Sequence, residues 1–268
     1  MIRKTLLNLT KIEAAYFTEE DMPHYGLNHY LGCAHNCLYC YARRMLRMSR
    51  EQWSEPDPVE NALELLREEI PRTKPGTVML CSMTDAYQPL RVRHSRSFFQ
   101  TRPILEMLLE AGFYVVIQTK SPGVLADLDL FQEYRKRVRI GMTIITPDDL
   151  VRRKWEPGAP AIESRIAAIQ MLSMKDIPTQ VSIEPLLPGT KYKDIVSLVS
   201  RLYFNADRWI LGVLNYRTDY DVYYSDMRNY LESLFDSCGM MDRVYFKQEH
   251  AAFPAPAERK DQKDVQKT

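Results

Sequence analysis

The stretch from Asn28 to Arg43 reads NHYLGCAHNCLYCYAR and places three of the five cysteines of the chain within eight residues. Cys33, Cys37 and Cys40 follow the spacing C-x3-C-x2-C, whereas Cys81 and Cys238 stand apart. Thiolates are soft ligands suited to iron–sulfur clusters or zinc. In a reducing compartment, clustered thiols indicate metal ligands before disulfides. The spacing therefore predicts a metal centre on this loop.

The number of cysteines separates two kinds of metal centre. A four-iron cluster held by three cysteines keeps one iron free of protein ligands, which is the open position that a catalytic site needs. Zinc would instead take a fourth ligand, for which His24, His29 and His35 are candidates. Zinc sites more often use C-x2-C pairs, and the sequence has no second pair. Three buried thiols without a metal are a third interpretation.

Composition limits the other classes of function. The 268 residues are 45% hydrophobic and carry a net charge of +1, which excludes global disorder and a polycation that binds nucleic acid through charge alone. None of the ten glycines falls in a G-x-G-x-x-G or Walker A pattern. No apolar run approaches the roughly 18 residues of a spanning helix, and the first residues do not resemble a signal peptide. We therefore expect a cytoplasmic protein without membrane contact.

Short β-branched runs alternate with helical patterns along the chain. Counting a strand just before Cys33, the pattern gives about six β/α units. The other runs lie near Thr77–Cys81, Phe113–Thr119, Val138–Thr143, Thr179–Ile183 and Trp209–Leu214. This alternation predicts parallel strands with right-handed crossovers. A closed eight-fold barrel typically needs about 250 residues, so the α/β fold is expected to be a partial (β/α)6 TIM-type barrel with a C-terminal helix and strand extension. A doubly wound open sheet is the alternative.

The expected organisation has four parts. An N-terminal segment covers residues 1–24, the partial barrel covers 25–214, the C-terminal extension covers 215–250, and a disordered tail covers 251–268. In either fold, ligands collect at the carboxyl ends of the strands, so residues that end strands are the first candidates for a site.

Several motifs between residues 25 and 190 match one known family closely. They are Asn28-x-Tyr30-x-Gly32-Cys33, Cys37-Leu-Tyr39-Cys40-Tyr41-Ala-Arg43, Thr84-Asp85-x-Tyr87-Gln88-Pro89, Thr119-Lys120-Ser121-Pro122, Asp127-Leu128-Asp129, Glu156-Pro157-Gly158-Ala159-Pro160 with Arg165, and Pro185-Leu-Leu-Pro188-Gly189. Together they resemble the radical S-adenosylmethionine (SAM) superfamily, in the branch similar to spore photoproduct lyase.

The resemblance implies a partial barrel with a [4Fe-4S] cluster on the loop after its first strand. The open iron binds the amino and carboxylate groups of SAM, and one electron, from a reductant such as flavodoxin or ferredoxin, cleaves the cofactor. The products are methionine and a 5′-deoxyadenosyl radical that abstracts hydrogen from a substrate. A lyase or repair reaction on a nucleic-acid-like substrate is the expected activity. The alternative is a zinc-stabilised nucleic-acid-binding module without catalysis.

The resemblance also suggests which residues contact the cofactor. Thr84 and Asp85 follow the second strand, where Asp85 accepts from the amino group of SAM or, alternatively, caps a turn. Lys120 and Ser121 end the third strand, where Lys120 pairs with a carboxylate or is a surface lysine. Thr143 ends the fourth strand and reaches the ribose hydroxyls or packs within the sheet.

For four further candidates, a role at the cofactor and a purely structural role are both open. Arg165 suits the methionyl carboxylate or forms a salt bridge with a nearby glutamate, Glu156 or Glu163. Glu184 contacts the cofactor or substrate, or is a solvated loop carboxylate. Tyr39 and Tyr41 flank the third cysteine, where such tyrosines are associated with radical transfer in spore photoproduct lyase, or they pack over the cluster and adenine.

Cys81 is the candidate hydrogen donor to a substrate radical, or a small buried hydrophobe. The branch usually has an acidic residue where this chain has Arg91. Basic residues after the cluster loop could bind phosphates or form a solvated helix face. These are Arg43, Arg44, Arg47 and Arg50. Tyrosines and arginines of the extension could stack on bases, or simply cover the barrel mouth.

Overall fold

The computed structural model describes residues 1–10, 22–89, 100–214 and 221–247. For residues 221–224 it describes the backbone alone. Predictions that fall on Arg91, on the tyrosines at 216, 220, 223 and 224, or on the tail from 251 to 268 concern positions outside this description. The proposed division of the chain into four parts stays a prediction.

One sheet of eight strands organises the described chain, in the order β1-β2-β5-β6-β7-β8-β9-β10. These strands are β1 (Leu7–Leu9), β2 (His24–Leu27), β5 (Thr77–Leu80), β6 (Tyr114–Thr119), β7 (Val138–Thr143), β8 (Thr179–Ile183), β9 (Arg208–Leu211) and β10 (Val244–Phe246). All neighbours pair in parallel except β1, which runs antiparallel to β2. A separate pair joins β3 (Tyr30–Leu31) to β4 (Asp57–Pro58).

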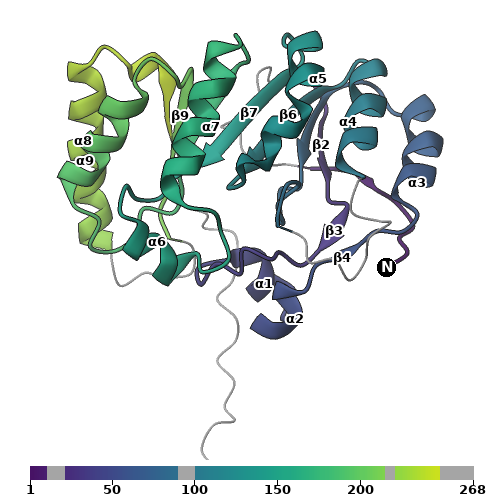
Figure 1. Cartoon of the computed structure of the whole chain (residues 1–268), viewed down its shortest axis with the longest axis horizontal. Coiled ribbons are helices and arrows are strands. Elements are labelled where there is room, and N and C mark those ends of the chain that lie inside the picture. The colour runs from purple at the N-terminus through teal and green to yellow at the C-terminus, as the bar shows by residue number, and fades with distance from the viewer. Residues whose placement is uncertain (11–21, 90–99, 215–220, 248–268) are drawn as a thin grey trace, which may run out of the picture.

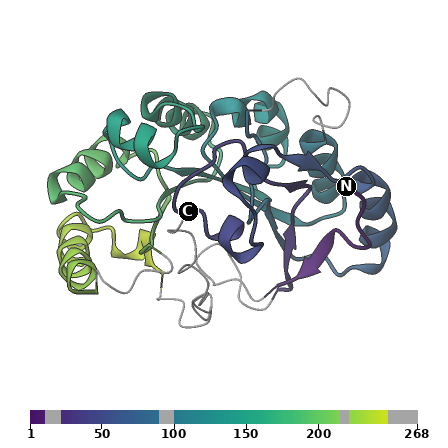
Figure 2. The same cartoon turned by 90° about the horizontal axis from the view of Figure 1, so that it is seen from below.

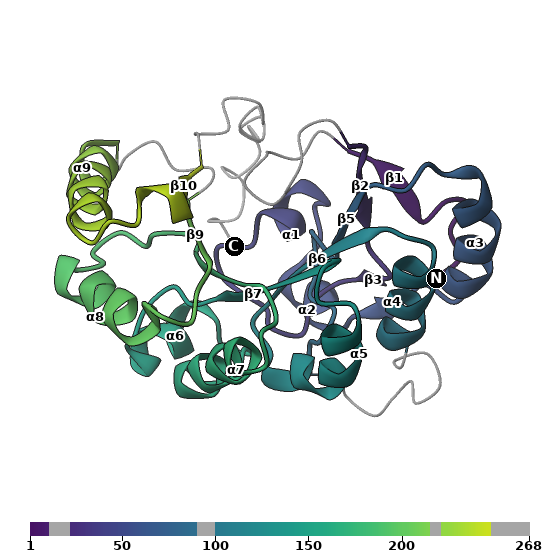
Figure 3. The same cartoon turned by 90° about the horizontal axis from the view of Figure 1, so that it is seen from above.

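Helices connect successive parallel strands, and most of them cover the outer side of the curved sheet (Figures 1 and 3). They are α1 (Tyr41–Met45), α2 (Arg50–Ser54), α3 (Ala62–Glu69), α4 (Thr101–Glu110), α5 (Leu128–Glu133), α6 (Asp149–Trp155), α7 (Ile162–Met174), α8 (Tyr192–Leu202) and α9 (Asp221–Ser237), with short 3-10 turns η2 (Ile70–Arg72), η4 (Pro122–Asp127) and η5 (Met241–Arg243). None of the described helices is long and apolar enough to cross a membrane.

The two faces of the sheet differ in chemistry. Val115, Ile117 and Ile140 belong to the large core that packs under the helices. The alternate positions face the concave side, where Met79, Val116 and Ile210 form a small apolar cluster. Polar side chains also lie on this side, where Gln180 donates to Gln118 at 2.8 Å. Gly141 lies between these two glutamines, and a Cβ there would lie 2.0 Å from the Gln118 side-chain oxygen. The concave face therefore combines a small apolar cluster with a polar region around Gln118 and Gln180.

The strand order distinguishes the two expected folds. A doubly wound sheet reverses its order at a switch point, whereas here β5 to β10 follow one another without reversal. In the described chain β1 and β10 end the sheet and do not pair with each other, so the barrel is open. The predicted α/β partial barrel is confirmed, with its predicted helix (α9) and edge strand (β10) after the last unit.

Candidate active site at the carboxyl ends of the strands

The cysteine loop leaves β3 through a turn that only glycine fits. Gly32 has φ +92°, and a Cβ there would lie 2.8 Å from the backbone oxygen of Trp53. The next amide, that of Cys33, donates to the same oxygen at 2.7 Å. Within the loop the amide of Cys40 donates to the Cys37 carbonyl at 3.2 Å. These bonds place all three thiols on one folded loop.

A second segment holds the loop from the other side. The turn after α6 brings Gly158 against the loop, where its amide donates to the His35 carbonyl at 3.0 Å. A Cβ at Gly158 would lie 2.1 Å from the Ala34 oxygen, so the close approach depends on glycine. Arg152 fixes this turn by donating to the Ala159 carbonyl at 2.9 Å.

Gln88 holds the loop from a third side. Its side-chain oxygen accepts from the Ala34 amide at 2.6 Å, and its nitrogen donates to the Gly32 carbonyl at 3.4 Å. Three of the motifs that were singled out in the sequence therefore meet at this loop.

The three thiols differ in exposure. Cys33 and Cys37 are buried, whereas Cys40 is half-buried. Burial raises the pKa of the Cys37 thiol to about 12 and that of Cys33 well above its ordinary value. Thiols in such surroundings stay protonated near neutral pH unless a bound metal supplies positive charge.

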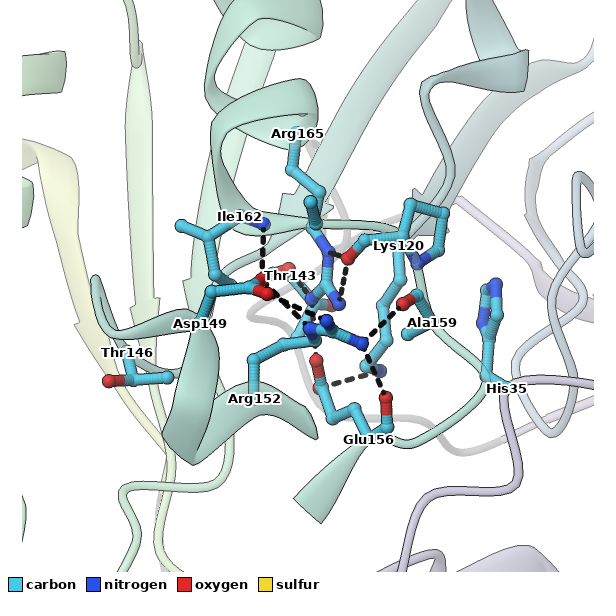
Figure 4. A network of polar contacts seen from close by, with 12 residues as sticks. His35, Lys120, Thr143, Thr146, Asp149, Arg152, Glu156, Ala159, Ile162 and Arg165 are labelled. Atoms are coloured by element: carbon cyan, nitrogen blue, oxygen red, sulfur yellow. Dashed lines mark hydrogen bonds and ion pairs between the residues drawn. The ribbon is translucent and has the colours of Figure 1, made fainter. Parts of the chain in front are cut away.

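A charged cluster formed by Tyr39, Lys120, Glu156 and Arg165 lies beside Cys37. Arg165 Nη1 contacts Glu156 Oε2 at 2.6 Å, and both side chains are fully buried. The Tyr39 hydroxyl donates to the other carboxylate oxygen, and Lys120 Nζ lies 3.9 Å from that oxygen. Figure 4 shows the side chains of Lys120 and Arg165 converging on Glu156. Two cations thus share one carboxylate.

Arg165 and Lys120 use their donors differently. Arg165 also donates to the carbonyl oxygens of Pro160 and Thr143, so its guanidinium is held by the protein. Of the two sequence interpretations, the structure places it in the salt bridge with Glu156. Among the described residues the Lys120 ammonium makes the long contact with Glu156 and lies 5.7 Å from the Tyr39 ring centre, and it forms no hydrogen bond. Lys120 therefore carries the spare positive charge of the cluster.

Asp85 is buried under the cysteine loop with both oxygens engaged. Oδ1 accepts from the Thr119 hydroxyl at 2.7 Å and from the Tyr87 amide at 2.9 Å. Oδ2 accepts from the Lys120 amide at 2.8 Å and lies 3.3 Å from His35 Nδ1. The bond to the residue two positions on is an Asx-turn. The turn-capping interpretation is thus present, and Asp85 joins β5, β6 and the cysteine loop.

Two of the other predicted strand-end residues, Ser121 and Thr143, also form side-chain hydrogen bonds within the protein. The Ser121 hydroxyl accepts from the Gly123 amide at 3.1 Å and caps η4. The Thr143 hydroxyl accepts from Gln118 at 2.9 Å. Thr84 lies in the turn after β5, and its amide donates to the Cys81 carbonyl at 3.2 Å.

Glu184 and Tyr41 lie at the edge of the site, where Glu184 follows β8 and Tyr41 begins α1. Lys247, directly after β10, donates to Glu184 Oε1 at 2.5 Å. Tyr41 donates from its hydroxyl to the Ser82 carbonyl at 2.9 Å. Sequence reasoning missed Lys247, although a charged residue that directly follows a predicted edge strand was an available signal.

A neutral cluster formed by His29, Cys81 and Thr101 lies just beyond the carboxyl ends of β2 and β5, where Thr101 begins α4. His29 Nδ1 lies 3.4 Å from Cys81 Sγ, and His29 Nε2 lies 3.0 Å from the Thr101 hydroxyl. Burial lowers the pKa of His29 to about 3 and raises that of Cys81 to about 12, so both are uncharged near neutral pH. These contacts match the packing interpretation of Cys81, while its role as a hydrogen donor stays a prediction.

The two metal interpretations need different arrangements of ligands. Among the described residues no three His, Cys, Asp or Glu side chains converge to hold a single metal ion. Zinc would require four ligands around one ion, whereas each cysteine of an iron–sulfur cluster binds a different iron.

Comparison with known proteins identifies the family to which the chain is similar. The sequence profile of the Radical SAM superfamily matches residues 27–202. Protein MJ0683 of Methanocaldococcus jannaschii, which is uncharacterised, is 32% identical over 69% of this chain and 66% of its own length. The chain spans only 50–66% of the length of the curated relatives that it matches.

Solved structures agree on the fold. A spore photoproduct lyase mutant aligns with a TM-score of 0.63 at 12% identity, over 92% of this chain and 81% of its own. SuiB of Streptococcus suis bound to SAM aligns with a TM-score of 0.59 at 14% identity, over 84% of this chain and 47% of its own. Neither comparison supports a zinc-stabilised binding module. With its profile match, its cysteine loop and its open barrel, the chain belongs to the radical SAM superfamily, whose members use a [4Fe-4S] cluster and SAM.

Proposed function

We propose that the chain is a radical SAM enzyme whose cluster is held by Cys33, Cys37 and Cys40. The observation that carries this proposal is the cysteine loop, which is fixed from three sides and offers three thiols. The donor set fits the group, because thiolates are the ligands of a [4Fe-4S] cluster and three of them leave one iron for SAM. When bound, the cluster supplies the electron that cleaves SAM to methionine and the 5′-deoxyadenosyl radical.

The chain's own residues would bind and orient the cofactor. Lys120 carries a positive charge without a hydrogen-bond partner among the described residues, which suits the methionyl carboxylate. Burial alone lowers the pKa of Lys120, but the thiolate form of Cys37, as in a loaded loop, and the Glu156 carboxylate outweigh it and raise the pKa, so the charge persists near neutral pH. Arg165 would act through Glu156, because its own donors are already used.

The remaining predicted residues form the walls of the site. Tyr39 would pack its ring beside the cluster, since its hydroxyl is committed to Glu156. Thr143 and Glu184 end neighbouring strands on the concave side, where they would meet the ribose or the substrate. Asp85 and Ser121 would shape the turns from which backbone groups face the cofactor. Thr84, in the turn after β5, and Tyr41, at the start of α1, would lie at the edge of the site.

For the reaction on the substrate, we propose a lyase or repair reaction on a nucleic-acid-like molecule. The motif resemblance to the spore photoproduct lyase branch supports this proposal. The polar region of the concave face supports it as well, because the side-chain oxygen of Gln180 has no hydrogen-bond partner among the described residues and could accept from a polar ligand. A low-potential flavodoxin or ferredoxin would supply the electron.

Anaerobic reconstitution followed by metal analysis tests the proposal. We expect about four irons and four sulfides per chain and a brown chromophore that bleaches on reduction with dithionite. A colourless protein that binds one zinc tightly would instead support the zinc-stabilised module. For the substrate, the first compound to test is a damaged thymine dinucleotide, and its conversion by the reduced enzyme with SAM would support the lyase reaction.

A further inference from the structure

An arginine patch follows the third cysteine directly. The ten residues from Tyr41 to Arg50 contain four arginines and no acidic residue. The patch consists of Arg43, Arg44, Arg47 and Arg50. Arg44 and Arg47 are exposed, and neither forms an ion pair within the described chain. The first acidic residue after the patch is Glu51. The site described above uses none of these arginines.

Two apolar side chains lie between the arginines. Met45 and Leu46 are 40% and 41% exposed, respectively, at the end of α1. Arginine and methionine are enriched in protein–protein interfaces, where an apolar centre is surrounded by charge. Protein–DNA interfaces are more polar throughout. The exposed apolar pair therefore favours a protein partner over a nucleic acid.

Arg47 adopts a conformation that usually belongs to glycine. Its φ is +54°, and the amides of Arg47 and Met48 donate back to the carbonyls of Arg44 and Arg43 at 3.0 and 3.1 Å. This is the left-handed residue that ends a helix, a position where glycine is preferred. A long cationic side chain at this position does not help the turn to form. The conformation does hold Arg47 outward, next to Arg44.

The patch is continuous with the cysteine loop. Arg50 Nε lies 3.4 Å from the side-chain oxygen of Asn36, which stands between the first two cysteines. Cys40, the most exposed of the three cysteines, immediately precedes α1. Figure 1 shows α1 and α2 projecting at the lower end of the molecule, away from the helices that cover the sheet, and Figure 2 shows this end from below.

We propose that the arginine patch, with Met45 and Leu46, is the docking surface for an acidic, low-potential electron-transfer protein. This inference rests on the proposed function, because it assumes a cluster on the loop. One electron leaves the reduced cofactor of the partner, which is oxidised by one electron, and enters the oxidised cluster, which is reduced by one electron. No bond breaks. A small patch suffices because electron-transfer encounters use small interfaces.

The test compares two reductants of different size and charge. The anaerobically reconstituted enzyme is mixed in a stopped-flow instrument with excess fully reduced flavodoxin, an acidic protein, and separately with dithionite. We expect Arg44→Glu/Arg47→Glu to slow reduction by flavodoxin at least about tenfold at low salt, because steering by charge is lost. The difference should shrink at about 1 M salt, where the Debye length is roughly 3 Å. Reduction by dithionite should be unchanged.

Two further variants test whether slower reduction comes from the arginine patch itself and not from misfolding or from charge reversal elsewhere. Arg47→Gly should fold at least as stably as the wild type, because glycine suits the left-handed turn, yet it should slow reduction by flavodoxin about threefold. Arg135→Glu/Lys136→Glu reverses two exposed charges after α5, where β7 begins at the opposite rim of the sheet. This control should be reduced by flavodoxin at the wild-type rate.

Each outcome has one meaning. Equal rates of reduction by flavodoxin for wild type and Arg44→Glu/Arg47→Glu would overturn the docking surface. A variant that loses affinity for duplex DNA while its reduction by flavodoxin is unchanged would also overturn it and assign the patch to nucleic acid. A wild-type protein that holds no cluster, or whose cluster dithionite cannot reduce, would contradict the proposed function itself.

Discussion

Two buried polar clusters lie near the carboxyl ends of the strands, and they differ in charge. The neutral cluster of His29, Cys81 and Thr101 carries no formal charge near neutral pH. The charged cluster beside Cys37 holds two cations and one carboxylate, with Glu156 and Arg165 fully buried. Buried neutral groups need only hydrogen-bond partners, whereas an excess buried charge needs a counter-charge. The second cluster is therefore suited to an anionic ligand, and the first is suited to packing.

The largest effect on stability should come from the shared carboxylate of the charged cluster. Glu156→Gln leaves the buried Arg165 and the half-buried Lys120 without the carboxylate that they share. Breaking a buried pair costs about 3–5 kcal/mol, so the free energy of unfolding in urea should fall by that amount. Glu163→Gln breaks the exposed pair with Arg201 and should cost less than about 1 kcal/mol. Equal losses of unfolding free energy in the two variants would contradict this account, because they would show that the Glu156 carboxylate is not needed to neutralise the two cations.

The neutral cluster should make stability depend on pH. His29 has a pKa of about 3 in the fold and about 6.5 when exposed, so below 6.5 the unfolded chain binds a proton that the folded chain does not. Its contribution is complete above 6.5 and is lost as the pH falls toward 3. This contribution of His29 to the free energy of unfolding should drop by about 1.4 kcal/mol per pH unit in this range.

Urea unfolding of the metal-free chain at about pH 7, 6 and 5, followed by circular dichroism, measures this slope. In His29→Gln the slope should be shallower by about 1.4 kcal/mol per pH unit. An unchanged slope would mean that His29 is protonated in the fold.

The spare charge of Lys120 should matter for binding more than for folding. Lys120→Met should retain iron and sulfide but bind SAM at least about tenfold more weakly, because a charge-assisted hydrogen bond contributes about 1.5–3 kcal/mol. Equilibrium dialysis with the oxidised cluster measures the affinity. Lys136→Met, an exposed lysine far from the loop, is the control. Wild-type affinity in Lys120→Met would remove Lys120 from the cofactor site.

The smallest effect is expected at Cys81. Cys81→Ala removes a small buried side chain and its contact with His29, and it should cost about 1 kcal/mol of stability. Cluster content, cofactor cleavage and product should not change. A variant that cleaves SAM normally but forms a different product from a substrate would show that Cys81 donates hydrogen and does not merely pack.

The sequence was sufficient for the parts of the fold that depend on local pattern. β-branched runs predicted the parallel strands from β5 to β9, because a strand that is buried under helices has a periodic signature of its own. The strand expected just before Cys33 was placed wrongly, since β3 lies outside the main sheet and β2 is the strand that pairs with β5. The cysteine spacing predicted the loop because ligand chemistry requires thiols at short range. Neither prediction needed information about distant contacts.

The contacts that complete the site come from long-range packing. Tyr39 and Glu156 are 117 positions apart, and nothing in either segment alone specifies the bond between them. Whether Arg165 would meet the cofactor or Glu156 was open for the same reason, because a guanidinium suits both carboxylates. Lys247 meets Glu184 only because β10 pairs with β9. The type of a residue predicts which groups its side chain can bind, and the fold determines which of those groups lies close enough to be bound.

The most direct test of the cysteine loop as the cluster site is the formation of 5′-deoxyadenosine from SAM by the reconstituted, dithionite-reduced chain. We expect the wild type and Cys238→Ala to form it, and Cys33→Ala, Cys37→Ala and Cys40→Ala each to form none, because all three thiolates anchor the cluster. Full formation by any one of the three loop variants, or none by a wild-type chain that holds its four irons, would contradict this assignment.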